Sequence, residues 1–223
     1  KYRGSVKAVH GSGKYTTHST YSGANKVIEN AIDFYNNRDK FKYSTTTPIS
    51  PFAKGKPADN KAKWYTGGKY HIDCSTFTNH LFKGRGYKNS IYKSSSTYGI
   101  GLSTNFSYGV DLGRYAASQA ETCVQNGWHL PIKAKDQTQW GNLKKGDLIF
   151  WSSRSSEGSR NETVSKRYMQ VGHVGVVAKV AKNSSGKYDV YVYDVSTPKG
   201  TVLYRELKKN FPDKLLFFAR VRK

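Results

Sequence analysis

The residues best able to do chemistry are one cysteine and one histidine, about a hundred positions apart. Cys74 stands in a His-Ile-Asp-Cys-Ser-Thr-Phe run at the predicted start of a helix, and His173 stands in a Gly-His-Val-Gly run that opens an apolar strand. A thiol attacks as the thiolate, and a neighbouring imidazole can supply that form. A helix start also favours an anion. If the fold brings these side chains together, they could cleave an amide bond.

A hairpin in the sequence offers a third side chain. Strand-like runs at 171–181 and 188–195 flank an Asn-Ser-Ser-Gly sequence, which is typical of two antiparallel strands joined by a turn. Counting pairs outward from that turn places His173 opposite Asp194 or Val195. Directly opposed residues share a face of a sheet. We therefore predict that Asp194 orients the imidazole, although a slip of one residue would turn it to the other face.

Apolar spacing predicts the elements that must position these groups. A helix is expected from Ala24 to about Arg38, and a second begins at Cys74, after the cap residue Asp73, and ends near Gly84. A third helix is expected over 111–125, and strands are expected at 148–151, 171–181, 188–195, 201–205 and 215–221.

Helices come first in this order and antiparallel strands come last. The pattern predicts an α+β fold in which N-terminal helices pack on a C-terminal antiparallel β-sheet. Residues 1–22 are polar and are interpreted as an N-terminal extension, and residues 23–223 are interpreted as one domain. Loops are expected at 44–63, 86–110 and 152–170.

Basic residues greatly outnumber acidic ones. The 223 residues include 37 basic and 15 acidic ones, for a net charge of +22. Such a field attracts polyanions, which include nucleic acid, anionic membranes and phosphate-containing wall polymers. No run reaches the roughly 18 apolar residues that a membrane span needs. The chain starts at Lys1 without an apolar leader, so we expect a processed mature form or an excised domain.

Two alternatives concern the cysteines. Cys74 and Cys123 could form one disulfide, which would exclude a nucleophilic Cys74, or both could be free. His71, Cys74 and His80 could also be zinc ligands, but their spacing lacks a fourth ligand. The expectation is that the protein holds no metal and no cofactor.

The order of several short motifs resembles the NlpC-type cell-wall peptidases, a papain-like family of bacterial and phage enzymes that cut peptidoglycan stem peptides. The similarity covers about residues 24–221. Its motifs are Gly67-Gly68 ahead of Asp73-Cys74-Ser75, the Leu-Lys-Lys-Gly-Asp-Leu run at 143–148, Gly172-His173-Val174-Gly175, the strand ending at Asp194, and Phe218-Ala219-Arg220-Val221.

The resemblance implies a papain-like fold with Cys74 as nucleophile, His173 as base and Asp194 as the third group. Asp194 stands where the family most often has a second His, and Thr76 replaces its usual Gly. In the related CHAP group the strand that carries the histidine is followed by a strand that carries an acidic residue. Asp194 fits that arrangement as well. The substrate-binding positions implied by the resemblance are Asp73 and Ser75, which would hold the peptide amine, together with Trp64 and Gly172.

By this resemblance the protein is expected to be a cell-wall endopeptidase that acts on peptidoglycan. It would be secreted and associated with anionic wall polymers, or be a phage lysin, and it is expected to be a monomer. The alternatives are a CHAP-like N-acetylmuramoyl-L-alanine amidase, a non-catalytic wall-binding protein and a nucleic-acid binder. Nucleic acid is the less favoured partner, because no RNA-binding motif is present and nucleic-acid binding does not explain the Cys-His-Asp order.

Overall fold

The computed structural model describes residues 23–49, 63–83, 109–153, 168–197, 200–210 and 212–222. The predicted extension at 1–22 lies outside these residues, as do most of the loops expected at 44–63, 86–110 and 152–170.

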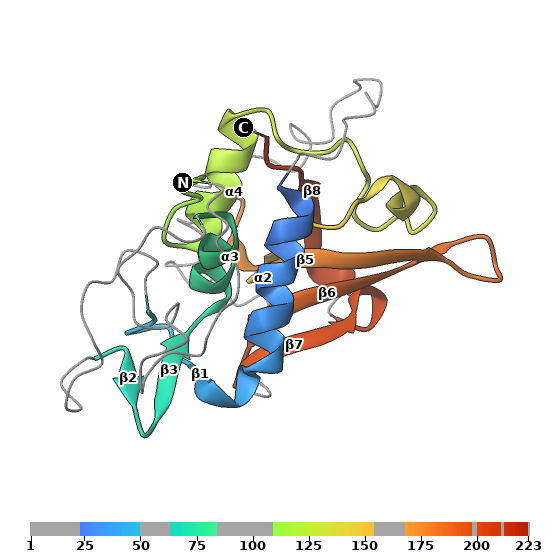
Figure 1. Cartoon of the computed structure of the whole chain (residues 1–223). Coiled ribbons are helices and arrows are strands. Elements are labelled where there is room, and N and C mark those ends of the chain that lie inside the picture. Colours follow the sequence, from blue (N-terminus) through green and yellow to red (C-terminus); the bar gives the residue numbers. More distant parts are fainter. Residues whose placement is uncertain are drawn as a thin grey trace.

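A five-stranded antiparallel sheet forms the centre of the fold, with the strand order β7-β6-β5-β4-β8 (Figure 1). Its strands are β4 (Leu148–Ser152), β5 (Val171–Lys182), β6 (Tyr188–Ser196), β7 (Thr201–Glu206) and β8 (Leu215–Ala219). The five predicted strands are confirmed, with small differences at their ends. Strand β5, which carries His173, is central and pairs with a neighbour along each edge.

A second, smaller sheet leads into the helix that carries the thiol. Strands β1 (Phe41–Tyr43) and β3 (Lys69–Ile72) are parallel, and β2 (Tyr65–Thr66) is antiparallel to β3. Gly67 and Gly68, with φ of 59° and 73°, make the turn between β2 and β3, a conformation that favours glycine. The two glycines that precede Asp73 in the sequence motif thus form a turn, whereas β1 and β3 were not predicted.

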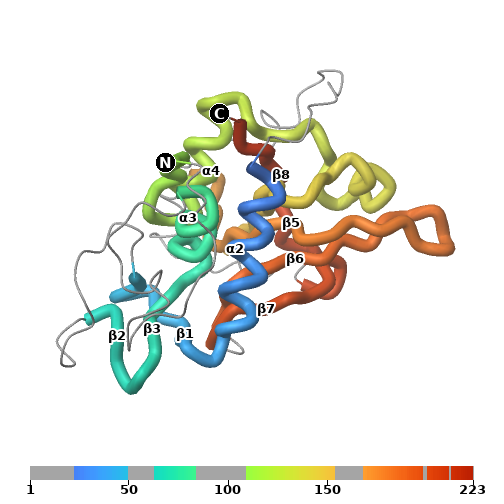
Figure 2. Tube along the Cα trace, in the orientation of Figure 1, coloured from blue at the N-terminus to red at the C-terminus, as the bar shows by residue number. Residues whose placement is uncertain are grey.

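The described helices are α2 (Ala24–Asn36), α3 (Cys74–Lys83) and α4 (Ala116–Gln125). Helix α3 packs on β5 and β6, α4 packs on β5, and α2 packs on β7 (Figure 2). The chain is therefore a mixed α+β protein with helices packed against an antiparallel sheet, as predicted.

The predicted start of the third helix, at residue 111, is wrong. Gly113 has φ of 97°, and its N–H donates to the Asp111 carboxylate over 2.9 Å. This local turn competes with helix formation. Helix α4 begins only after Tyr115, whose N–H donates to the Ser118 hydroxyl over 3.0 Å.

Apolar side chains fill both faces of the large sheet. The helices cover one face, where Phe77 and Leu81 of α3 join the core with Val174 and Val176 of β5. The segment that follows α4 covers the other face. It contributes Leu130, Ile132, Ala134, Trp140 and Leu143 to a core shared with β4, β5, β6 and β8.

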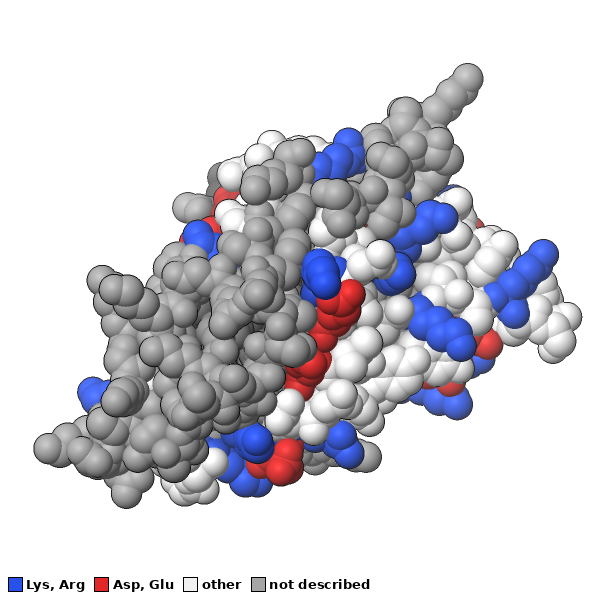
Figure 3. Space-filling view, viewed as in Figure 1, with Lys and Arg blue, Asp and Glu red and all other residues white. Residues whose placement is uncertain are grey.

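On the face drawn in Figure 3, the basic side chains of the described residues are spread out rather than gathered in one patch. Figure 3 shows lysines and arginines across the described part of one face, with acidic atoms along a strip where α2 lies. Helix α2 carries Glu29 and Asp33. No helix in the described part of the chain is long and apolar enough to cross a membrane.

A buried ion pair joins β4 to the chain end. Arg220 Nε and Nη2 donate to the two carboxylate oxygens of Asp147 over 2.7 and 2.8 Å, and both side chains are almost fully inaccessible. The Lys144 N–H also donates to Asp147, over 2.7 Å. Two of the motifs behind the family resemblance, at 143–148 and 218–221, are thus one structural unit.

Removing one partner should leave a buried charge uncompensated. We expect Arg220→Met to lower the free energy of unfolding by about 3–5 kcal/mol, measured by urea denaturation. Lys26→Met is the control, because it breaks the exposed Lys26–Glu29 pair and should cost no more than about 1 kcal/mol. Equal losses in the two variants would contradict the structural role of Arg220.

Candidate active site

Asp73 caps helix α3 at the residue before the thiol. Its Oδ1 accepts the Thr76 N–H over 2.8 Å, the Thr76 hydroxyl over 2.9 Å and the Ser75 hydroxyl over 3.1 Å. The predicted cap is therefore confirmed. Cys74 follows directly in the first turn of the helix, where the backbone N–H groups favour a negative charge.

Helix α3 is buried on all sides from Cys74 to Phe82. Its polar side chains bond to other segments: the Thr78 hydroxyl donates to Gln119 Oε1 over 2.7 Å, and His80 Nε2 donates to the Ile49 carbonyl over 3.0 Å. These bonds fix both the rotation and the depth of the helix. They therefore fix where the Cys74 sulfur lies.

His173 and Asp194 are in contact. His173 Nε2 lies 2.6 Å from Asp194 Oδ2, and the Asp194 side chain is completely buried. The predicted partnership of these two side chains is confirmed as a hydrogen bond.

The predicted strand register is wrong, however. Asp194 lies opposite Gly175 rather than opposite His173. The turn closes between Asn183 and Lys187, later than the count assumed, and β5 carries an extra residue between Val177 and Lys179. The net shift is two residues, which keeps both side chains on one face. They meet diagonally across the strands.

Gly175 makes this diagonal contact possible. A Cβ at residue 175 would lie 3.1 Å from Asp194 Cβ and 3.2 Å from Trp151 Cη2, closer than ordinary packing allows. The Trp151 and His173 rings lie with their centroids 5.0 Å apart. The missing side chain therefore lets Asp194 and Trp151 occupy the space beside His173.

Arg205 on β7 holds Asp194 from the other side. Its Nε donates to Asp194 Oδ1 over 2.9 Å, and its Nη2 forms a second bond, to Oδ2. Arg205 lies opposite Val192, two residues from Asp194, so it shares the face of Asp194 and His173. The three side chains form a diagonal row across β5, β6 and β7. Sequence reasoning missed Arg205, which a residue count across the β6–β7 turn could have found.

Arg205 and His173, on either side of Asp194, keep this completely buried carboxylate ionised. Burial raises the pKa of Asp194, but the hydrogen bonds and charges of His173 and Arg205 outweigh that effect and hold the pKa below its ordinary value. Ionised Asp194 therefore stabilises the fold near neutral pH, and this contribution is lost as pH falls through the lowered pKa.

Arg205→Gln should remove one of the two charged partners that keep the buried Asp194 carboxylate ionised. We expect the free energy of unfolding at pH 7 to fall by about 3 kcal/mol or more, because one partner of a buried ion pair is lost. The pKa of Asp194 should rise, so acid unfolding followed by circular dichroism should begin at a higher pH than in the wild-type protein. Arg38→Gln, on an arginine whose bond is to the exposed Tyr35 carbonyl, is the control. Unchanged acid unfolding in Arg205→Gln would contradict this account.

His173 also interacts with Cys74. Burial lowers the pKa of His173, but the charge of Cys74, the hydrogen bonds of the ring with Asp194 and Cys74, and the charge of Asp194 together raise it to about 10. The structure thus brings the three predicted catalytic residues together. His173 remains protonated at neutral pH, and its stabilising contribution is complete below its unfolded value of about 6.5 and is lost as pH rises towards about 10.

Replacing the thiol should lower the pKa of His173, because two of the interactions that raise it come from Cys74. We expect an NMR titration of the His173 ring in Cys74→Ala to show the lower value, with Cys123→Ala unchanged. A His173 pKa that is equal in the Cys74→Ala variant and the wild-type protein would show that the sulfur and the ring do not interact.

Both cysteines are free, which removes the disulfide alternative. Cys123 on α4 is completely buried, and burial raises the pKa of its thiol well above the ordinary range. Cys74 is buried too, but it lines a cleft.

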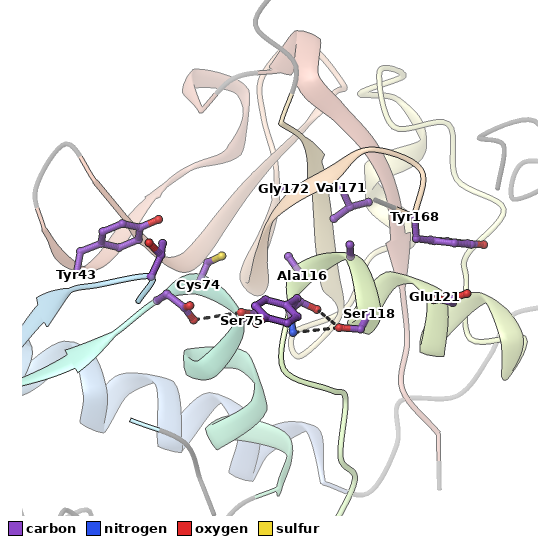
Figure 4. Close-up of a pocket in the computed structure, with 13 residues that line it drawn as sticks. Tyr43, Cys74, Ser75, Ala116, Ser118, Glu121, Tyr168, Val171 and Gly172 are labelled. Carbon is purple, nitrogen blue, oxygen red and sulfur yellow. Dashed lines mark hydrogen bonds between the residues drawn. The ribbon is translucent and has the colours of Figure 1, made fainter. Parts of the chain in front are cut away.

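The cleft beside Cys74 has a volume of about 510 Å³ (Figure 4). One wall comes from the start of β5, with Val171 and Gly172, and another comes from the first turns of α4. The remaining lining residues are Tyr43, Thr45, Asp73, Ser75 and Tyr115, with Tyr168 and Glu121 on the side away from Tyr43 (Figure 4).

Three of the four predicted substrate-binding residues line this cleft, namely Asp73, Ser75 and Gly172. Gly172 leaves no room for a side chain, because a Cβ there would lie 2.1 Å from Ser153 Cβ. The structure does not bring Trp64 to the cleft. Its ring stacks on Tyr70 at 6.1 Å with an interplanar angle of 9°, and the aromatic side chain from the small sheet that lines the cleft is Tyr43.

Arg114 was also missed by sequence reasoning. Its Nη1 donates to Asp73 Oδ2 over 2.9 Å and to the Ser75 hydroxyl over 3.2 Å, and its Nη2 donates to the Thr45 carbonyl over 3.4 Å. Each oxygen of the Asp73 carboxylate therefore has a donor from the protein itself. No short motif marks Arg114, because it precedes α4 in a segment predicted to be helical.

The structure places the candidate zinc ligands in separate environments. The His71 ring lies between the hydroxyls of Thr47 and Thr66, each 2.8 Å from a ring nitrogen, and His80 bonds to a backbone carbonyl. Among the described residues, no group of three or more His, Cys, Asp or Glu side chains is arranged to hold a metal ion.

Comparison with models of known protein families gave no match, and comparison with curated proteins gave none either. The candidate site therefore rests on its geometry.

Proposed function

We propose that the protein is a papain-like cysteine peptidase of the NlpC type that cleaves an amide bond in peptidoglycan stem peptides. The observation that carries the proposal is the contact of His173 with both Cys74 and Asp194, at the first turn of a buried helix and beside a cleft. A thiol, an imidazole and an orienting carboxylate in this order are the parts of a cysteine hydrolase.

The raised pKa of His173 defines its starting state. At neutral pH the ring carries a proton, and the thiolate is the form of a cysteine that attacks. His173 Nε2 is bonded to Asp194, which leaves Nδ1 for Cys74 and the substrate. The thiolate attacks the amide carbonyl carbon, the C–N bond breaks, and the His173 imidazolium gives its proton to the leaving nitrogen.

The start of α3 can stabilise the oxyanion of that step. Asp73 accepts the Thr76 N–H, whereas the N–H groups of Cys74 and Ser75 have no acceptor among the described residues. Backbone N–H groups at a helix start are suitable donors to a developing negative charge.

The second half of the reaction regenerates the thiol. Neutral His173 takes a proton from a water molecule, whose oxygen attacks the thioester carbonyl, and the C–S bond breaks to release the acid. Asp194, held by Arg205, keeps the ring in one orientation through both steps.

The charge of the protein suits an anionic cell wall. A net charge of +22 would hold the enzyme on wall polymers that carry phosphate, and raised salt would weaken that attraction. Such an enzyme would work outside the cell or be a phage lysin.

A CHAP-like amidase is the second candidate. It is favoured by the third group being a carboxylate on the strand after the histidine strand. An amidase and an endopeptidase would share the chemistry of Cys74 and differ only in the amide bond placed beside it.

Cys74→Ala should abolish the release of peptides from purified peptidoglycan while leaving wall binding intact. The control is Cys123→Ala, because Cys123 is a completely buried thiol outside the cleft. Mass spectrometry of the fragments released from walls of known stem type would identify the bond cleaved and separate the two candidates. Undiminished release by Cys74→Ala would eliminate both, and binding without release by the wild-type protein would favour the non-catalytic alternative.

A further inference from the structure

Four tyrosines from three elements meet where α2 packs on β7. Tyr204 on β7 contacts the other three rings, with centroid distances of 5.6 Å to Tyr191, 5.0 Å to Tyr193 and 6.2 Å to Tyr35. Tyr35 of α2 and Tyr193 of β6 are also in contact, at 5.6 Å. We call these four side chains the tyrosine surface. None of them lines the cleft beside Cys74.

The tyrosine surface is open to solvent. Three large apolar side chains are exposed in the described part of the chain, and two of them lie here: Tyr204, and Ile32, which precedes Tyr35 by one turn of α2. Each exposes 39% of its surface. Figure 3 shows uncharged atoms beside the acidic strip of α2. Single exposed apolar side chains are ordinary, but neighbouring ones that form a patch mark an interaction surface.

Cations at both ends hold the rings of this surface in place. Arg38 Cζ lies 4.5 Å from the centroid of the Tyr35 ring, and Lys179 Nζ lies 6.0 Å from that of Tyr191. Between them, the Tyr191 and Tyr204 rings stack with an interplanar angle of 8°. Rings fixed in this way lose little conformational freedom when a ligand binds.

The tyrosine hydroxyls are uncharged and available to a ligand. No described residue forms a hydrogen bond with the hydroxyl of Tyr35, Tyr191, Tyr193 or Tyr204. Burial, followed by the neighbouring tyrosines, raises the pKa of both Tyr193 and Tyr204, so these groups are neutral near pH 7. Each exposed tyrosine therefore offers a ligand an apolar ring and a hydroxyl that can donate or accept.

Charges of both signs border the tyrosine surface. Glu206 lies directly opposite Tyr191, on the same face of the sheet, and is paired with two lysines. Helix α2 adds Glu29 and Asp33 on the other side. These carboxylates would repel the phosphates of a nucleic acid. An uncharged ligand that has both hydroxyl groups and apolar ring faces fits the surface better, and a chain of pyranose sugars has both.

We propose that the tyrosine surface binds an uncharged glycan, namely a β-linked chain of N-acetylhexosamine units. The C–H faces of the sugars would pack on Tyr204 and Ile32, and their hydroxyls would bond to the tyrosine hydroxyls. The choice of N-acetylhexosamine rests on the proposed function, because this kind of sugar chain carries the stem peptides of peptidoglycan. The surface would hold the protein on the glycan while the separate cleft beside Cys74 reaches a peptide.

Chitohexaose, which is six β-1,4-linked N-acetylglucosamine units without any peptide, is the probe for this surface. We expect it to shift the NMR signals of the Tyr35, Tyr191 and Tyr204 rings in the wild-type protein. Calorimetry should give a roughly five- to tenfold lower affinity for Tyr204→Ala, because the central ring and its hydroxyl are both lost. Tyr204→Phe, which keeps the ring and the packing, should bind about two- to threefold more weakly. Tyr65→Ala, on a tyrosine of the small sheet, is the matched control and should keep the wild-type affinity.

Because the probe carries no stem peptide, its binding is independent of the proposed reaction. Unshifted tyrosine signals, or equal affinities in Tyr204→Ala, Tyr204→Phe and the wild-type protein, would overturn the glycan surface even if the protein cleaved stem peptides. Binding in a protein that cleaves no peptide would still support it. Shifts of the same rings by a single-stranded oligonucleotide but not by chitohexaose would assign the surface to nucleic acid. Shifts that follow protein concentration alone would assign it to a second copy of the chain, and either result would overturn the proposal.

Discussion

The structure depends on the complete burial of helix α3. A buried helix must find a partner for each polar side chain it carries, because an unpaired polar group in a protein interior costs roughly 1–3 kcal/mol. In α3 the partners come from different parts of the chain: Thr78 bonds to α4, and His80 bonds to the segment after β1. The helix can therefore occupy only one position between the sheet and its neighbours. The position of Cys74 is therefore set by hydrogen bonds made by other side chains of the same helix.

The Asp194 carboxylate, which is bonded to His173, is likewise buried and depends on its hydrogen-bond partners. Asp194 has no exposed surface, so its charge is tolerable only while Arg205 and His173 both donate to it. Arg205 thus serves the fold and the site together. A buried ion pair adds little stability over an apolar replacement, but it strongly resists the loss of one member. This arrangement favours a fixed orientation of the imidazole over maximal stability.

Sequence reasoning predicted most of the fold and the three central residues of the site. The strands of the large sheet and the start of α3 were predictable because runs of β-branched and aromatic residues, turn residues and a capping Asp are local signals. The register of the β5–β6 hairpin was not, because the extra residue near Val177 has no sequence signature. Sequence reasoning missed Arg205 and Arg114 as site residues for another reason. An arginine on a strand or in a loop is usually a surface residue, and only the three-dimensional structure shows which carboxylate it reaches.

The distance along the chain between Cys74 and Arg205 has a consequence for protein synthesis. Ribosomes add roughly 5–20 residues per second and release the N-terminal part first. While the chain emerges, α3 is made long before β5, β6 and β7 exist to place an imidazole beside the sulfur. For that interval the nascent chain holds the Cys74 thiol without the imidazole that contacts it in the folded protein. Under the proposed function, a hydrolase built in this order would stay inert until nearly all of it has been made.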